Sequence, residues 1–182
     1  RDFGADHVVI CQEGRSWRKD FYEPYKANRK VARAALTEAE QEEDALFWEA
    51  FDDMGKFLIE RTACSVMRCP VAEADDLIAR WIYNHPNDEH VIISSDTDFR
   101  QLITDRVTQF NGITNEHYTL NGVFNDKGKP VIDKKTKLPK VIEDPQWLLF
   151  EKCIRGDSSD NVFSAYPGVR KKGSKNKVGL IE

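Results

Sequence analysis

The sequence predicts an α/β fold with a mostly parallel sheet flanked by helices. Two observations carry this prediction: apolar runs at residues 7–11 and 91–93 are typical of buried strands, and amphipathic helical patterns lie between them. Strands that alternate with helices form parallel sheets covered on both faces. The 182 residues are enough for one domain with a small appendage.

The longest predicted helix covers residues 37–61. It opens on a capping box, Thr37 to Glu40, in which the threonine and glutamate side chains each satisfy a backbone amide of the first turn. Apolar residues then recur at helical spacing as far as Leu58. This pattern indicates an amphipathic helix that packs one face on the sheet.

A second helix is predicted at 73–83, directly before the strand at 91–93. Short strand-like pieces separated by turn residues follow at 117–142, and they predict a β-hairpin excursion from the core. A last helix begins at Asp144 and Pro145, an N-cap followed by proline at the first helical position, and Gly156 closes it. The chain thus re-enters the fold after the hairpin.

The charges are unevenly distributed, although the net charge is only −4. Segments 15–33, 127–140 and 166–181 each carry a net charge of +5, which leaves the carboxylates concentrated in the rest of the chain. Such a protein can bind a polyanion through its basic segments and divalent cations through its acids. The alternative is that these segments are solvated, lysine-rich loops.

Several classes of protein are excluded or disfavoured. The four cysteines form no C-x-x-C pair and the four histidines no H-x-x-x-H pair, so neither a zinc module nor a disulfide framework is expected. No apolar stretch is long enough to span a membrane and no signal-peptide pattern is present, which favours a cytoplasmic protein without a membrane partner. Because Arg1 is not an initiator methionine, we expect the sequence to begin inside a larger protein.

Three clusters of carboxylates lie at predicted element boundaries: Glu73-Ala74-Asp75-Asp76, Asp96-Thr97-Asp98, and the segment 156–161 with Asp157 and Asp160. Each has an ordinary explanation taken alone, as helix N-terminal charge, as a turn, or as an N-cap. Brought together, they would repel one another unless cations were present, and hard oxygen ligands select Mg²⁺ or Mn²⁺. Phosphoryl transfer by two metal ions is the chemistry that needs such a pocket.

These clusters occur in order with a basic and aromatic segment, residues 16–29, and with Pro167-Gly168-Val169. In this order the sequence resembles the 5′-nuclease (flap endonuclease) superfamily, which includes phage 5′→3′ exonucleases of the phage RNase H type and the 5′-nuclease domain of bacterial DNA polymerase I. The resemblance implies a PIN-like catalytic core at 1–155 with a helical arch. It also implies the start of a helix–hairpin–helix-like DNA-binding element at 156–182.

The resemblance assigns roles to individual residues. It implies that metal ions are held, directly or through water, by Glu73, Asp75, Asp76, Asp96, Asp98, Asp157 and Asp160. Lys26 and Arg29 match basic arch residues that contact the scissile phosphate, and Arg18 and Tyr25 match DNA-binding positions, the tyrosine as a surface on which a base stacks. In isolation, Tyr25 would more often be a packing residue.

The hairpin is expected to hold the duplex backbone. The resemblance implies that main-chain amides grip phosphates there, often with a K⁺ ion, and it implicates Gly168, Val169, Arg170, Lys171, Lys172 and Lys175. This segment is longer and more basic than the usual turn of the family, and the 121–142 segment is also longer than expected. Recognition of DNA structure rather than base sequence is the expectation.

Two departures concern the metal site. The first strand of the family, which carries a metal-binding aspartate, is absent from the sequence. In the family, the strand matching residues 8–11 normally ends in a second metal-binding aspartate, and here that position is Cys11. Cysteine is a poor ligand for Mg²⁺. Glu13 is either a substitute ligand or an exposed turn acid.

The function expected from the resemblance is two-metal hydrolysis of phosphodiester bonds at 5′ ends or 5′ flaps of DNA, or of RNA primers on DNA, by a monomer in phage or bacterial DNA replication. The alternative is a non-catalytic protein that binds flaps or forks through a degraded metal site, which Cys11 favours. The seven other carboxylates disfavour it, because a pure binder gains nothing from negative charge beside DNA. A ribonuclease of the PIN-domain class is the third alternative.

Overall fold

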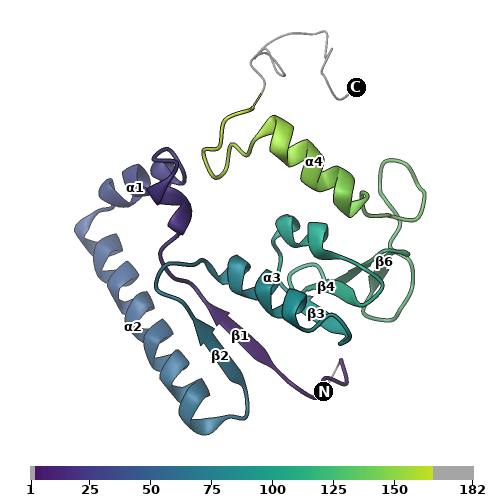
Figure 1. Ribbon diagram of the computed structural model, residues 1–182, viewed down its shortest axis with the longest axis horizontal. Helices are drawn as coiled ribbons and strands as arrows, with labels where there is room; N and C mark the ends of the chain where they lie inside the picture. The colour runs from purple at the N-terminus through teal and green to yellow at the C-terminus, as the bar shows by residue number, and fades with distance from the viewer. Residues whose placement is uncertain (1–2, 166–182) are drawn as a thin grey trace. The chain divides into compact units, whose positions relative to one another are not determined.

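The computed structural model describes residues 3–165, and the chain forms two compact units. Unit 1 comprises Arg1–Trp81 with Ser158–Val162, and unit 2 comprises Ile82–Asp157 with Phe163–Glu182. Each unit has its own sheet, and Figure 1 labels the helices and strands. Helices combined with parallel strand pairs confirm the predicted α/β class.

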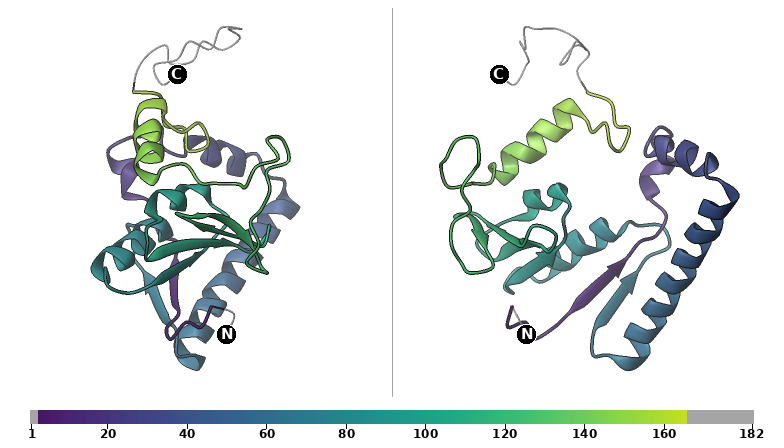
Figure 2. Two further views of the ribbon diagram at one scale, coloured as in Figure 1. Left: turned by 90° about the vertical axis from the view of Figure 1, so that its right-hand side faces the viewer. Right: turned by 180° about the vertical axis from the view of Figure 1, so that it is seen from behind.

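In unit 1, strand β1 (Val9–Gln12) pairs in parallel with β2 (Ser65–Arg68), so that Cys11 lies beside Met67. The connection between them contains the 3-10 helix η1 (Trp17–Asp20) and the helices α1 (Ala27–Ala34) and α2 (Glu38–Arg61). Two parallel strands require a long crossover of this kind. Helix α2 runs beside β2 (Figures 1 and 2).

The capping box of α2 forms as predicted. The Thr37 amide donates to Oε2 of Glu40 over 2.8 Å, and Oγ1 of Thr37 accepts from the Glu40 amide over 3.4 Å. Helix α2 approaches the sheet at Gly55, where an added Cβ would lie 2.4 Å from Nε2 of Gln12. A larger residue at Gly55 would therefore have to displace the glutamine amide.

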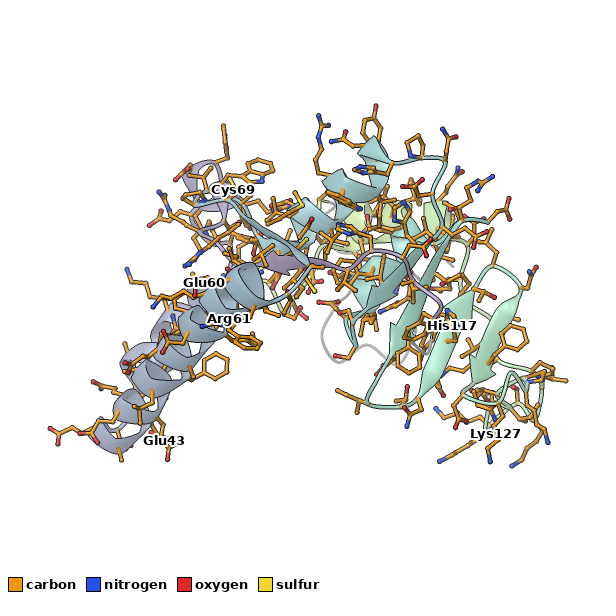
Figure 3. All side chains as sticks on the ribbon, turned by 90° about the horizontal axis from the view of Figure 1, so that it is seen from below. Glu43, Glu60, Arg61, Cys69, His117 and Lys127 are labelled. Carbon is orange, nitrogen blue, oxygen red and sulfur yellow. The ribbon has the colours of Figure 1, made fainter. Side chains whose placement is uncertain are left out.

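The apolar residues of α2 are more exposed than its amphipathic pattern implies. Phe47 is 60% exposed and Met54 48% exposed. Figure 3 shows side chains extending away from α2 along its length, from Glu43 to Arg61. The boundaries of the helix agree with the prediction, but the described part of the chain leaves much of its apolar face uncovered.

Helix α3 (Ala74–Asn84) begins directly after Glu73, close to the predicted start. Oε2 of Glu13 accepts from the Ala74 amide over 2.9 Å, which satisfies one of the amides left without a partner at a helix N-terminus. Asp75 and Asp76 occupy the first turn, where the helix dipole favours negative charge.

Unit 2 is built on a sheet in the order β3-β4-β5-β6. Strand β3 (His90–Ile93) is parallel to β4 (Val107–Asn111), and β5 (Glu116–Thr119) and β6 (Gly122–Asn125) continue the sheet as an antiparallel hairpin. Ile103, Tyr118 and Val123 form its buried cluster, with Val131 and Ile142 packed against it. The 117–142 segment therefore extends the sheet and supplies part of the core.

Among the described residues, unit 2 also contains two short helices. The 3-10 helix η2 (Thr97–Leu102) follows β3, and α4 (Pro145–Arg155) packs against it. Oδ1 of Asp144 accepts from the amides of Gln146 and Trp147, each over 2.9 Å, and Gly156 ends α4 with a φ of +71°. Both ends of α4 thus agree with the sequence prediction. Within residues 3–165, no helix combines the length and apolar character needed to cross a membrane.

Candidate active site

Glu73 is the most buried carboxylate of the predicted site, with 3% of its surface exposed. Four side chains of unit 1 donate hydrogen bonds to it: Ser16 over 2.8 Å, Arg18 over 2.9 Å, Tyr25 over 2.9 Å, and Lys26. Burial opposes ionisation of Glu73, but the bonds from Lys26, Ser16 and Tyr25 outweigh it and hold its pKa below the usual value. Glu73 is therefore ionised and fixed in position at neutral pH.

Arg18 joins Glu73 to Asp76. Its Nη1 donates to both carboxylates over 2.9 Å, and its Nη2 donates to Oδ1 of Asp76 over 2.7 Å. This two-pronged contact is the geometry in which arginine binds carboxylates most strongly. The hydrogen bond from Arg18 lowers the pKa of Asp76.

Asp160 is held by the segment that contains Tyr25, Lys26 and Arg29. The Lys26 amide donates to the Asp160 carbonyl over 2.8 Å, and Nη2 of Arg29 donates to Oδ1 of Asp160 over 2.8 Å. Nζ of Lys26 lies 3.8 Å from Oδ2 of Asp160. Lys26 adopts a left-handed backbone with φ of +54°, which turns the chain directly before α1. Two predicted arch residues thus meet a predicted metal ligand within unit 1.

Tyr25 is 8% exposed, so its ring is buried. Its hydroxyl donates to Glu73 and lies 3.2 Å from Oδ2 of Asp160. Burial, with a contribution from the bond to Glu73, raises the pKa of Tyr25 to about 12. The hydroxyl remains protonated and holds two carboxylates, whereas base stacking on this ring stays a prediction.

Near the end of β1, Cys11 is half-buried, and burial raises the pKa of its thiol. Only the thiolate binds metals well, so Cys11 is a weak candidate ligand.

The side chain of Glu13 accepts from the Ala74 amide and acts as a helix cap. Asp75 is exposed on the first turn of α3.

In unit 2, Lys152 of α4 lies between two predicted metal ligands. Its Nζ donates to Asp98, and to Oδ2 of Asp157 over 3.0 Å. Burial opposes the charge of Lys152, but the bonds to Asp98 and Asp157 raise its pKa. Two carboxylates therefore already share one cation.

Asp96 serves as the N-cap of η2. Its Oδ1 accepts from the Asp98 amide over 2.8 Å, and the Asp96 side chain is otherwise exposed. Asp96 can therefore act both as a turn-forming residue and as a predicted metal ligand beside Asp98. Capping fixes the direction in which the chain leaves β3.

The described residues contain no group of three or more His, Cys, Asp or Glu side chains close enough to hold a metal ion. The chemistry of the donor set nevertheless fits a hard divalent ion, because every predicted ligand is a carboxylate and Lys152 shows that a cation is accommodated by Asp98 and Asp157. The predicted DNA-binding residues of the hairpin lie outside the described residues: Gly168, Val169, Arg170, Lys171, Lys172 and Lys175.

Sequence reasoning missed three residues that contact predicted site residues or the backbone beside them: Ser16, Gln109 and Lys152. Ser16 is 3% exposed and bonds Glu73 from a distant position in the chain, and nothing local predicts that contact. Lys152 lies in the last turn of α4, where a basic residue has an ordinary explanation in the helix dipole. Gln109 also carries no local signal, because the segment 107–111 shows no apolar run from which a buried strand face could be predicted.

The carboxylates of unit 1 make its stability depend on pH. Because the folded pKa values of Glu73 and Asp76 lie below the usual ones, their contribution is complete above about pH 5 and is lost as the pH falls through the folded values. Urea unfolding between pH 7 and pH 3 should therefore show constant stability to about pH 5 and a decline below it. Asp76→Asn should flatten part of that decline, and an unchanged slope in this variant would contradict the assignment.

A family model described as "5'-3' exonuclease, N-terminal resolvase-like domain" matches residues 1–128. The chain is 28% identical to a flap endonuclease of Escherichia phage T5 over 96% of its length and 54% of the relative's. It is 30% identical to a 5'-3' exonuclease of Bacillus subtilis over 98% of its length and 53% of the relative's. The chain thus spans about half the length of these curated relatives.

Solved structures of a phage T5 nuclease are also similar to the chain. A T5 5'-exonuclease with bound zinc ions is 25% identical and gives a TM-score of 0.71, covering 91% of this chain and 57% of that one. A T5 flap endonuclease in a complex with DNA and metal ions gives a TM-score of 0.68 at the same identity and coverage.

Proposed function

Because the chain belongs to the family of the 5'-3' exonuclease N-terminal, resolvase-like domain, we propose that it is a metal-dependent nuclease that hydrolyses phosphodiester bonds at 5′ ends and 5′ flaps of DNA. One observation carries the proposal. In unit 1, the phosphate-binding candidates Arg18, Lys26 and Arg29 all reach predicted metal ligands. These cationic side chains can bind a phosphate, and the adjacent carboxylates can bind divalent ions, so the arrangement favours a phosphate bound next to the ions.

Mg²⁺ or Mn²⁺ is the proposed cofactor, since carboxylate oxygens favour both. The proposed ligands, direct or through water, are Glu73, Asp75, Asp76, Asp96, Asp98, Asp157 and Asp160. Two bound ions would lower the pKa of a bound water, so that hydroxide forms near neutral pH. They would also place positive charge beside the scissile phosphate. A K⁺ ion at the 167–169 hairpin is part of the same proposal.

The cationic side chains have a separate role in this proposal. Lys26 and Arg29 bind the scissile phosphate and stabilise the negative charge that develops on it. Arg18 holds Glu73 and Asp76 and leaves 36% of its side chain exposed toward solvent, where a further phosphate can approach. Burial opposes the charge of Lys26, but hydrogen bonds to Glu73 and Tyr25 raise its pKa, so it stays charged at neutral pH.

We propose that the protein cleaves RNA primers on DNA as well as DNA, in phage or bacterial replication, and that it acts as a monomer. A second candidate, a flap-binding protein that does not cut, is favoured by the protonated, half-buried Cys11.

Cleavage of an end-labelled 5′-flap duplex tests the proposal. Wild-type protein in Mg²⁺ should release products cut near the junction, Mn²⁺ should support the same reaction, and EDTA should abolish it. Cleavage that survives EDTA would contradict metal dependence. Tight binding of an intact flap in Mg²⁺ would instead establish the non-catalytic function, and Cys11→Asp would then be the first variant to make.

A further inference from the structure

Gln109 is a polar residue at a buried position of strand β4. The side chains of Val107, Gln109 and Asn111 share the buried face of this strand, and Gln109 is 1% exposed. A buried amide costs free energy unless its hydrogen bonds are made, so an apolar residue is the ordinary choice there. The hydrogen bonds of Gln109 explain why a polar residue lies at this position.

Nε2 of Gln109 donates to two backbone carbonyls at the end of the neighbouring strand. The acceptors are the carbonyl of Ser94, 2.9 Å away, and that of Asp96, 2.6 Å away. The Cα of Gln109 pairs with Ile92 in the parallel register, so the side chain leans forward along β3 to reach them. Reversing the amide would place Oε1 against two carbonyl oxygens, so the two acceptors fix its orientation.

The two carbonyls bracket the point at which the chain leaves β3 for η2. Asp96 then caps η2 by accepting from the Asp98 amide, and the Ser94 amide donates to the Phe110 carbonyl over 3.0 Å. The orientation of the Asp96 and Asp98 side chains therefore depends on the backbone at residues 94–96, which Gln109 of β4 holds through its two hydrogen bonds.

We propose that Gln109 is a positioning residue for the metal-binding carboxylates Asp96 and Asp98, acting through the carbonyls of Ser94 and Asp96. The proposal rests on the function proposed above. Supporting residues that orient metal ligands typically change metal affinity by about 10-fold to 100-fold when they are removed. Gln109 would act in this way without touching the ion.

Mn²⁺ binding measured by calorimetry, without DNA, tests this role. Gln109→Met keeps the length of the side chain but removes its donors, and we expect Mn²⁺ affinity to fall about 10-fold to 100-fold. Gln109→His places a ring N–H near the position of Nε2 and should restore part of the affinity. Val107→Ala, on the same face of β4, is the control: it should lower stability and leave Mn²⁺ affinity unchanged.

The outcomes separate this inference from the proposed function. Wild-type protein that binds no Mn²⁺ would overturn both. Wild-type binding with equal affinity in Gln109→Met would overturn the positioning role alone, as would a loss in Val107→Ala as large as in Gln109→Met. If Gln109→Met does not fold, Gln109→Asn replaces it, because its amide is one methylene too short to reach both carbonyls and the same loss is expected.

Discussion

The Asp96→Asn/Asp98→Asn protein should cleave a 5′ flap about 10³-fold more slowly than the wild type, or not at all. Bound metal ions contribute several kcal/mol to the stabilisation of a phosphoryl-transfer transition state, and each factor of ten in rate corresponds to about 1.36 kcal/mol. Asparagine keeps the shape of each side chain but supplies a neutral, weaker ligand. Single-turnover cleavage in saturating Mg²⁺ measures this effect.

Folding should be nearly unaffected by the same change. The asparagine introduced in place of Asp96 can still accept from the amide of residue 98, so the cap of η2 is retained, and Lys152 keeps Asp157 as a partner. The matched control is Asp52→Asn/Asp53→Asn, which makes the same change in net charge on exposed positions of α2. Cleavage lost equally in both proteins would indicate a general charge effect, and cleavage retained by the Asp96→Asn/Asp98→Asn protein would contradict the assignment of these ligands.

Helices α2 and α4 could be predicted closely because their ends are encoded locally. The capping box at Thr37, the Asp144-Pro145 start and the Gly156 end each depend on residues within one turn of the boundary. Strand β3 could also be predicted, because its β-branched run has no polar interruption, although only Ile92 of that run is buried and Ile93 is 69% exposed. The α/β class followed from these elements, and the order of the motifs along the chain indicated the family.

Strands β2 and β4 could not be predicted, since neither shows an apolar run. Strand β4 alternates Val107, Gln109 and Asn111 on its buried face, and both polar residues are there to bond backbone atoms of turns. Asn111 bonds the amides of the turn that follows it, whereas the acceptors of Gln109 lie 15 and 13 positions earlier in the chain and are known only from the fold. A hydrophobic pattern does not predict hydrogen bonds between a buried polar side chain and the backbone.

The partners of the predicted site residues were likewise beyond the sequence. The resemblance placed Arg18 and Lys26 near DNA, whereas the structure pairs both with Glu73. Charge pairs of this kind depend on tertiary contacts between residues about 50 positions apart. The resemblance identifies which residues matter, and the fold determines how they are held.

Removing the Glu73 carboxylate should have the largest effect on stability. Glu73→Ala should lower the free energy of unfolding by about 3–5 kcal/mol, the usual cost of leaving buried charges without a partner. Lys26 and Arg18 would each lose an acceptor, and so would the hydroxyls of Ser16 and Tyr25. Urea unfolding at pH 7 measures the change, with Asp53→Ala as a control that should leave stability almost unchanged, since its ion pair with Lys56 is exposed.

The cause of that loss can be separated from the loss of packing. If unpaired charge dominates, adding Lys26→Met to Glu73→Gln should recover much of the stability, because neither residue of the pair then carries a buried charge without a partner. Each of these residues is also proposed to act in cleavage, so the double variant should regain stability and remain inactive. A protein as unstable as Glu73→Ala after both changes would show that the Glu73 contacts matter through shape rather than charge. Recovery of both stability and cleavage would instead argue against a role for Lys26 and Glu73 in the reaction.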